Sequence, residues 1–89
     1  MSYQEIADIF KVLSDPNRVK ILSIIYENKD VCVCKIQEQL DITQPTLSYH
    51  MKLLQDVKLV ECWKEGTQCH YKLNDETLGK VRKYLKDFE

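Results

Sequence analysis

Residues 43–54 read TQPTLSYHMKLL, and this stretch decides the fold. Thr43 is a favoured N-cap residue, so a helix is expected to begin directly after it. Leu47, Met51 and Leu54 recur at helical spacing, which predicts one buried stripe. The remaining positions carry polar side chains. The segment is therefore predicted to be a helix that rests on a core and presents a polar face to solvent.

A shorter helix is predicted just before this segment. Ile36 and Leu40 are four residues apart, which favours a helix over Cys34–Leu40. Residues 41–43 then form a tight turn. Two helices joined by about three residues, the second with a polar face, are typical of a helix-turn-helix.

Two more helices are predicted at the N-terminus. Tyr3–Leu13 repeats apolar residues at helical spacing, and Ser14-Asp15-Pro16 stops this helix and starts the next. Either Ser14 or Asp15 is expected to cap the second helix. That helix is apolar almost all round until residues 28–30, which predicts a central place in the core.

After Asp56 the apolar residues recur at every second position instead of at helical spacing, which predicts the strands of a β-hairpin. Leu59–Lys64 is the expected first strand, and Gln68–Leu73 is the expected return strand. A two-residue turn at Glu65-Gly66 would place Cys62 opposite Cys69. Asn74 and the next residue are then expected to cap a last amphipathic helix.

The order of these elements predicts a mainly α (α+β) fold. It is a winged helix-turn-helix with four helices, a β-hairpin wing and a C-terminal helix, and residues 1–89 are expected to form a single domain. A chain of 89 residues buries only a limited core, so dimerisation is an expected source of further burial.

The composition excludes several classes of protein. The chain is 44% hydrophobic and 30% charged with only two Gly, which argues against a disordered or collagen-like chain. No apolar run approaches a membrane span and residues 1–8 do not read as a secretory signal, so the expected compartment is the cytoplasm. A nucleophile–base pair, a Gly-rich phosphate loop and a paired-carboxylate pocket are all missing, so no enzyme is expected.

Four stretches together resemble a known family. They are LSDPNRVKIL at 13–22, VCVCKI at 31–36, TQPTLSYHMKLL at 43–54, and a wing with LV at 59–60, KEG at 64–66 and YKL at 71–73. This combination is similar to the ArsR (ArsR/SmtB) family of metal- and metalloid-responsive repressors, over nearly the whole chain. The resemblance implies a homodimer formed through the first and last helices. It also implies binding to an inverted repeat in double-stranded operator DNA.

The polar helix face and the resemblance predict the DNA-contacting residues. Side chains such as Gln, Ser and Thr bond base edges in the major groove, while Lys holds phosphates. The expected contacts on the helix are Gln44, Thr46, Ser48, Tyr49, His50 and Lys52, and those on the wing are Lys64, Thr67 and Gln68.

Cys32 and Cys34 are the candidate inducer ligands. The resemblance implies an arsenic- or antimony-responsive repressor, and thiolates are the ligands that such soft ions prefer. On a regular helix the two side chains would point about 200° apart, whereas in an extended segment they share a face. Chelation is therefore expected to need an unwound helix start. A disulfide within Cys-x-Cys is expected to be strained, which argues against oxidation of this pair.

Several alternatives stay open at this point. Gln37 stands where some family members have a third Cys, so a third ligand could be Cys62, Cys69, an external thiol or an oxygen. An organic arsenical would need only two thiols. The cysteines of the hairpin could also form a labile disulfide or bind a metal with His70, although simple strand packing is favoured.

The last helix, from Glu76 to Glu89, contains no His, so an interface zinc site is not expected there. No cofactor is expected to be required beyond As(III) or Sb(III) as inducer. The rival functions are a thiol-redox or persulfide-responsive repressor of the same fold, and a winged-helix module that binds proteins.

Overall fold

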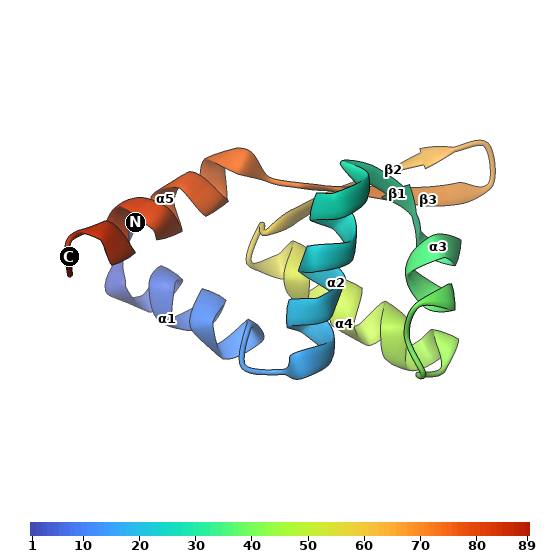
Figure 1. Ribbon diagram of the computed structural model, residues 1–89, viewed down its shortest axis with the longest axis horizontal. Helices are drawn as coiled ribbons and strands as arrows, with labels where there is room; N and C mark the ends of the chain where they lie inside the picture. Colours follow the sequence, from blue (N-terminus) through green and yellow to red (C-terminus); the bar gives the residue numbers. More distant parts are fainter.

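Five helices and three strands make up the computed structural model, which describes residues 1–89 (Figure 1). The helices are α1 (Tyr3–Val12), α2 (Pro16–Asn28), α3 (Val33–Glu38), α4 (Gln44–Asp56) and α5 (Asp75–Lys86). The strands are β1 (Asp30–Cys32), β2 (Val60–Glu65) and β3 (Gln68–Leu73). The predicted winged helix-turn-helix is confirmed, with α3 and α4 as the two helices of the motif.

Polar side chains cap the helices where the sequence predicts. Asp15 accepts a hydrogen bond from the backbone N–H of Asn17 at the start of α2. Thr43 caps α4 and Asn74 caps α5 in the same way. These side chains satisfy N–H groups that have no partner within the helix. The helix starts are therefore fixed by local sequence.

The sheet contains a third strand that the sequence analysis did not predict. β1 pairs antiparallel with β3, and the sheet order is β1-β3-β2. Lys29 ends α2 with a positive φ of 65°, which turns the chain back along β3. Three residues have no periodicity of their own, and only Val31 is buried on this strand. Its partner lies 40 residues further along the chain, at Tyr71, so local spacing carries no sign of it.

The hairpin register differs from the predicted one. The turn residues are Gly66 and Thr67, and Glu65 pairs with Gln68. Gly66 has a φ of 62°, and hairpin turns need such a residue at the first central position. That requirement keeps Glu65 in β2, so every residue of β2 pairs with a different residue of β3 from the one predicted. The prediction that Cys62 lies opposite Cys69 is therefore wrong.

One hydrophobic core joins the helices to the sheet. The buried stripe predicted for α4 is confirmed, since Leu47, Met51 and Leu54 are each at most 2% exposed. They share the core with Ile21 and Ile25 of α2 and with residues from every other element. The full cluster is Ile6, Ile9, Val12, Ile21, Ile24, Ile25, Val31, Ile36, Leu40, Leu47, Met51, Leu54, Leu59, Val60, Tyr71 and Val81.

The molecule is elongated, with extents of 40 × 22 × 20 Å. Figure 1 shows α1 and α5 together at one end, with both chain termini, and the β2–β3 hairpin at the other end. α3 connects β1 to the turn that leads into α4. None of the helices has the length and apolar character needed to cross a membrane.

Candidate nucleic-acid interface and thiol site

The outer face of α4 carries most of the predicted DNA contacts. Gln44, Thr46, Ser48, Tyr49 and Lys52 are all exposed, and Tyr49 is 59% exposed. The Thr46 hydroxyl accepts a hydrogen bond of 2.9 Å from Thr43, so it is held near the helix start. The arrangement offers hydroxyl, amide and ammonium groups along one helix.

His50 does not belong to this exposed set. It is only 6% exposed, and its Nδ1 lies 3.0 Å from Nη1 of Arg18 on α2. A guanidinium has only donors, so the imidazole Nδ1 accepts this hydrogen bond. The expectation that His50 contacts DNA directly is contradicted by its burial. Its side chain instead fixes α4 against α2.

Arg18 is a positioning residue that the sequence analysis did not single out. Its Nε donates to the carbonyl oxygen of Val12 at the end of α1, so one side chain connects α1, α2 and α4. Arg18 also acts on Asp15. Desolvation raises the pKa of the Asp15 carboxyl. The hydrogen bonds from the backbone N–H groups of Asn17 and Arg18, together with the Arg18 charge, have a larger and opposite effect, so the net pKa lies below its usual value. The signal in the sequence is the Asp-Pro-x-Arg run at the start of α2.

The predicted wing contacts lie at the tip of the hairpin. Lys64, Thr67 and Gln68 are exposed, and Thr67 is one of the two turn residues. Gln68 pairs with Glu65 at the last position of the ladder. These three residues contribute one cation and two neutral polar groups to the tip, where the Glu65 carboxylate is also exposed.

Cys32 and Cys34 come together at the junction of β1 and α3. Cys32 has extended backbone angles of φ −73° and ψ 152° and is the N-cap residue, whereas Cys34 lies in the first turn. The Cα atoms are 5.3 Å apart and the two sulfurs form a disulfide. The Cα separation lies within the usual range for disulfides, so the two side chains are close enough to share a bond or a ligand. The expected unwinding is already present, because the helix begins only at Val33.

The hairpin cysteines lie on the other face of the sheet. Cys32 is the register partner of His70, and Cys69 is the neighbour of His70 along β3. Neighbouring residues on a strand point to opposite faces, so Cys69 faces away from Cys32. Cys62 pairs with Tyr71 and shares the face of Cys69. Neither hairpin cysteine is placed to join Cys32 as a third ligand.

Tyr71 lies on that inner face, opposite Cys62 and two residues after Cys69 on β3. Desolvation raises the pKa of its phenol above the usual value of 10.0, and the nearby Cys62 and Cys69 raise it further. Cys69 is partly buried against the core and Cys62 is exposed. Strand packing, the favoured interpretation for this pair, agrees with Cys69 but not with the exposed Cys62.

His70 makes contacts on the outer face that the sequence did not indicate. Its Nε2 lies 3.1 Å from a Glu65 carboxylate oxygen, and its Nδ1 lies 3.6 Å from Asp30. The ring stacks on Trp63 with a centroid distance of 5.9 Å. No group of three or more His, Cys, Asp or Glu side chains is arranged to hold a metal ion. The expected alternative of a metal bound by His70 and the hairpin cysteines therefore does not match the structure.

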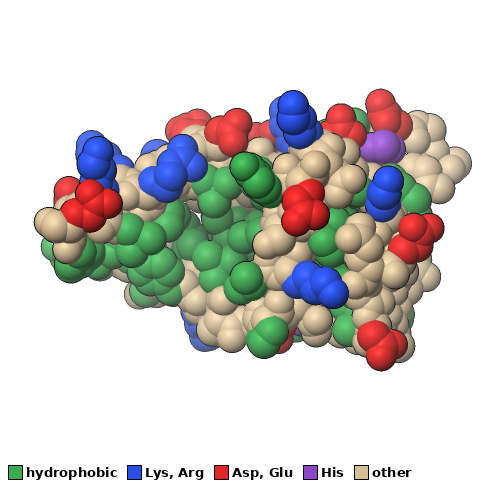
Figure 2. Space-filling model, in the orientation of Figure 1, with side chains coloured by type: hydrophobic (Ala, Val, Ile, Leu, Met, Phe, Trp, Pro, Cys, Tyr) green, Lys and Arg blue, Asp and Glu red, His purple; other side chains and the backbone are tan.

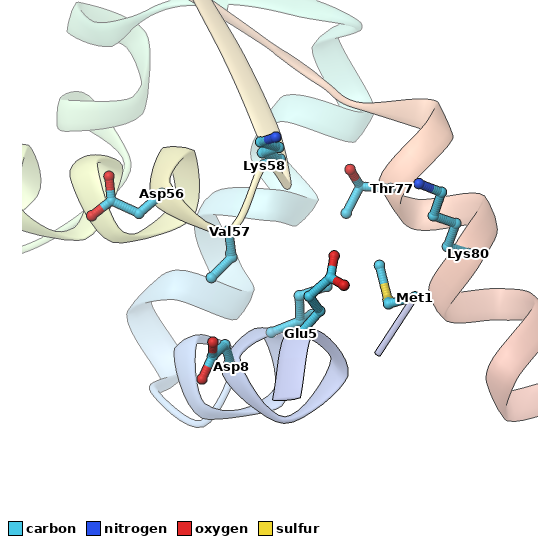
Figure 3. Close-up of a pocket in the computed structure, with 9 residues that line it drawn as sticks. Met1, Glu5, Asp8, Asp56, Val57, Lys58, Thr77 and Lys80 are labelled. Atoms are coloured by element: carbon cyan, nitrogen blue, oxygen red, sulfur yellow. The ribbon is translucent and has the colours of Figure 1, made fainter. Parts of the chain in front are cut away.

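A hollow of about 200 Å³ lies between α1, the α4–β2 turn and α5 (Figure 3). Its lining mixes acidic and basic side chains, including Glu5, Lys58 and Lys80. The Glu5 carboxylate already accepts a hydrogen bond from the backbone N–H of Ser2. Hydrogen bonding with Ser2 lowers the pKa of Glu5. None of the predicted DNA-contacting or thiol residues lines this hollow, so it is separate from both candidate sites.

Hydrophobic side chains are exposed at the end formed by α1 and α5. Figure 2 shows them gathered there, away from the wing. Phe88 is 72% exposed and Leu85 is 50% exposed on α5, while Phe10 is 39% exposed on α1. Tyr84 links the two helices through ring contacts with Phe10 at 6.3 Å and Phe88 at 5.2 Å. This end leaves a contiguous apolar surface without a partner.

The placement of the cysteines predicts which pair responds to oxidation. After treatment with diamide, mass spectrometry should find a Cys32–Cys34 disulfide, while Cys62 and Cys69 remain open to alkylation. The reason is that the Cα atoms of Cys32 and Cys34 are 5.3 Å apart, whereas Cys62 and Cys69 are not register partners in the hairpin. Cys34→Ser is the control and should leave Cys32 alkylated as well. A Cys62–Cys69 disulfide in the oxidised wild type would contradict the register.

Comparison with known proteins identifies the family. The family model described as bacterial regulatory protein, arsR family, matches residues 15–61, which run from the cap of α2 into β2. An arsenical resistance operon repressor of Staphylococcus xylosus is 44% identical over 96% of this chain and 81% of its own length. An uncharacterised HTH-type transcriptional regulator of Methanocaldococcus jannaschii is 38% identical over 96% of both chains.

A solved structure shares the fold. It is the homodimeric winged helix-turn-helix domain of a possible ArsR-family regulator from Mycobacterium bovis, with a TM-score of 0.77. It is 23% identical and covers 94% of this chain and 80% of its own. The family match and the fold agree with each other and with the motifs in the sequence. The chain therefore belongs to the ArsR family of DNA-binding transcriptional regulators, and it is a regulator rather than an enzyme.

Proposed function

We propose that this protein is a homodimeric repressor that leaves its operator when trivalent arsenic or antimony binds Cys32 and Cys34. The observation that carries the proposal is the meeting of the two sulfurs at the start of α3, the first helix of the helix-turn-helix. The 44% identity to an arsenical resistance operon repressor supports the same class of inducer. A ligand at this point acts on the helix that leads into α4.

The DNA contacts of the proposal come from α4 and the wing. α4 enters the major groove with its exposed polar side, and the hairpin tip reaches the adjacent backbone or minor groove. His50 is removed from the contacts predicted by the sequence and is assigned to positioning, since it bonds Arg18. The contacts that remain are Gln44, Thr46, Ser48, Tyr49, Lys52, Lys64, Thr67 and Gln68.

Tyr49→Ala tests the assignment of α4 to the major groove. Affinity for operator DNA should fall by roughly fivefold or more, because one good base contact is worth about 1–3 kcal/mol. Stability should change by less than about 0.5 kcal/mol, because Tyr49 is exposed. Fluorescence anisotropy and urea unfolding measure the two effects. Tyr26→Ala, at an exposed tyrosine of α2, is the matched control, and equal DNA affinity of the two variants would reject the assignment.

The dimer of the proposal forms through α1 and α5. Exposed Phe10, Leu85 and Phe88 form an apolar surface that a second copy would cover. A two-fold axis at this end places two α4 helices on one face of the DNA, about 34 Å apart, which fits an inverted repeat. The Mycobacterium bovis structure of the same fold is described as homodimeric, which supports this assembly.

Leu85→Glu tests the dimer. A carboxylate in the middle of the apolar surface would be desolvated on association, so the variant should sediment as a monomer in analytical ultracentrifugation. Its helical circular dichroism should be unchanged, because Leu85 is 50% exposed in the single chain. Tyr26→Glu places the same charge on an exposed site of α2 and should remain dimeric. A dimeric Leu85→Glu variant would exclude this face as the interface.

The thiol chemistry needs the reduced pair. Arsenous acid exchanges two of its hydroxyl groups for the sulfurs of the two thiols, and each departing hydroxyl group leaves as water with the proton of one thiol. The remaining position on arsenic is left for a small external thiol or an oxygen, because Cys62 and Cys69 face the other side of the sheet. A methyl or aryl arsenical already fills that position with carbon and needs only the two thiols. Both kinds of inducer fit the proposed site.

Titration of the reduced protein on DNA from upstream of its own gene tests the whole proposal. Binding should weaken steeply with salt, because lysines neutralise phosphates. Arsenite should release the DNA from the wild type and from Cys62→Ser, but not from Cys34→Ser. Release from all three proteins would exclude the proposed ligands. Failure of arsenite and of phenylarsine oxide to release the wild type would leave the DNA binding and reject the inducer.

A second candidate signal is supported by the disulfide itself. In this alternative, Cys32 and Cys34 give up two protons and two electrons to an oxidant such as diamide, and the disulfide form has a different DNA affinity. Release by diamide, with no effect of arsenite in excess reductant, would favour this alternative. The opposite result would favour arsenic. The protein-interaction alternative is set aside, because the family match is to DNA-binding regulators.

A further inference from the structure

Gln37 links α3 to the segment that precedes the recognition helix. Its side-chain Nε2 donates a hydrogen bond of 2.6 Å to the backbone carbonyl oxygen of Ile42. Gln37 lies one helical turn after Cys34, since residues three apart are neighbours on a helix surface. Ile42 directly precedes Thr43, whose hydroxyl caps α4. One side chain thus joins the helix of Cys34 to the start of α4.

This hydrogen bond has no parallel elsewhere in α3. Among the side-chain hydrogen bonds of the molecule, it is the only one that leads from α3 to the following turn or to α4. Gln39, two residues later, is exposed and bonds the carbonyl of Lys35 within α3 itself. Both glutamines donate a side-chain hydrogen bond to a backbone carbonyl, but only the bond of Gln37 leads out of α3.

The acceptor half of the Gln37 amide has no partner. Its Oε1 is buried and accepts no hydrogen bond. A buried acceptor without a donor costs free energy, which offsets much of the stabilisation from the Nε2 bond. The Gln37 amide is therefore held to the segment before α4 through its Nε2 alone.

We propose that Gln37 is the positioning residue through which the state of Cys32 and Cys34 reaches α4. The inference rests on the proposed function of that cysteine pair. The structure has the link in place while the two sulfurs are joined. Separating the sulfurs, or placing an arsenic atom between them, changes their spacing at the first turn of α3. Gln37 carries the change to Ile42 and so to the capped end of α4.

The position of the link explains why a small shift matters for DNA. Thr43 holds the backbone N–H of Thr46, and both residues lie at the end of α4 that carries Gln44 and Thr46 as proposed contacts. Recognition helices contact base edges mainly through their N-terminal residues. Displacing the carbonyl of Ile42 therefore acts where DNA affinity is most sensitive to position.

The variants Gln37→Met and Gln39→Met provide a matched test. Methionine has a similar length but neither donates nor accepts at the end of its side chain. Hydrogen exchange of the backbone amides of residues 43–47 is compared between the reduced and the diamide-oxidised protein. Wild type and Gln39→Met should differ between the two states, whereas Gln37→Met should show the same exchange in both.

Arsenite affinity, measured with and without bound DNA, gives the second readout. In the free protein, Gln37→Met should bind arsenite within about twofold of wild type, because the thiols are intact. The ratio of the two affinities should fall by about fivefold or more, since that ratio reports the coupling between the sites. A role in stability alone would lower the unfolding midpoint and leave both the ratio and the exchange difference intact.

The two readouts separate the failure of this inference from that of the proposed function. If arsenite does not change DNA binding of the wild type, the proposed inducer fails, yet the exchange comparison still tests Gln37 without arsenite. If the wild type shows no exchange difference at residues 43–47, no signal reaches α4 and the role of Gln37 is overturned. It is also overturned if Gln37→Met retains the wild-type difference.

Discussion

The burial of one side of α4 is the constraint on which the rest of the structure depends. Leu47, Met51 and Leu54 enter a core that α2 supplies with Ile21 and Ile25. Once this stripe is buried, helical geometry leaves the polar side chains of α4 outside. A recognition helix of this kind must be held firmly, because a displacement moves every base-contacting group at once. The hydrogen bond between Arg18 and His50 adds a polar contact between α2 and α4 to their hydrophobic packing.

The two ends of the elongated molecule have different chemistry, and this division suits a regulator. The α1–α5 end exposes a group of hydrophobic side chains beside its charged ones (Figure 2), whereas the exposed side chains of the wing tip are polar or charged. The near-neutral net charge of −1 therefore says little about DNA binding, because the relevant charges are local. Association of two copies at the apolar end would leave both polar ends free.

The thiol pair sits between these regions, in a segment that changes from strand to helix within three residues. Cys32 is the last residue of β1 and occupies the N-cap position of α3, and Cys34 lies in the first helical turn. The pair thus spans the boundary between a strand that is paired with β3 and the start of a helix. Gln37 then provides a short path from the pair to the cap of α4. The proposed inducer site and the proposed DNA-contacting helix are thus connected by a single helix of six residues and a short turn.

Local sequence alone determined the helices, their caps, the hairpin and the winged helix-turn-helix fold. Periodicity and capping act over three to seven residues, so residues 43–54 and the cap at Asp15 could be interpreted without a structure. Tertiary structure decided the rest. β1 exists only because it pairs with β3, and the positive φ of Gly66 shifted the hairpin register away from a Cys62–Cys69 pair. The burial of His50 and the link from Gln37 to Ile42 were also hidden, because each depends on a partner that the fold alone brings into reach.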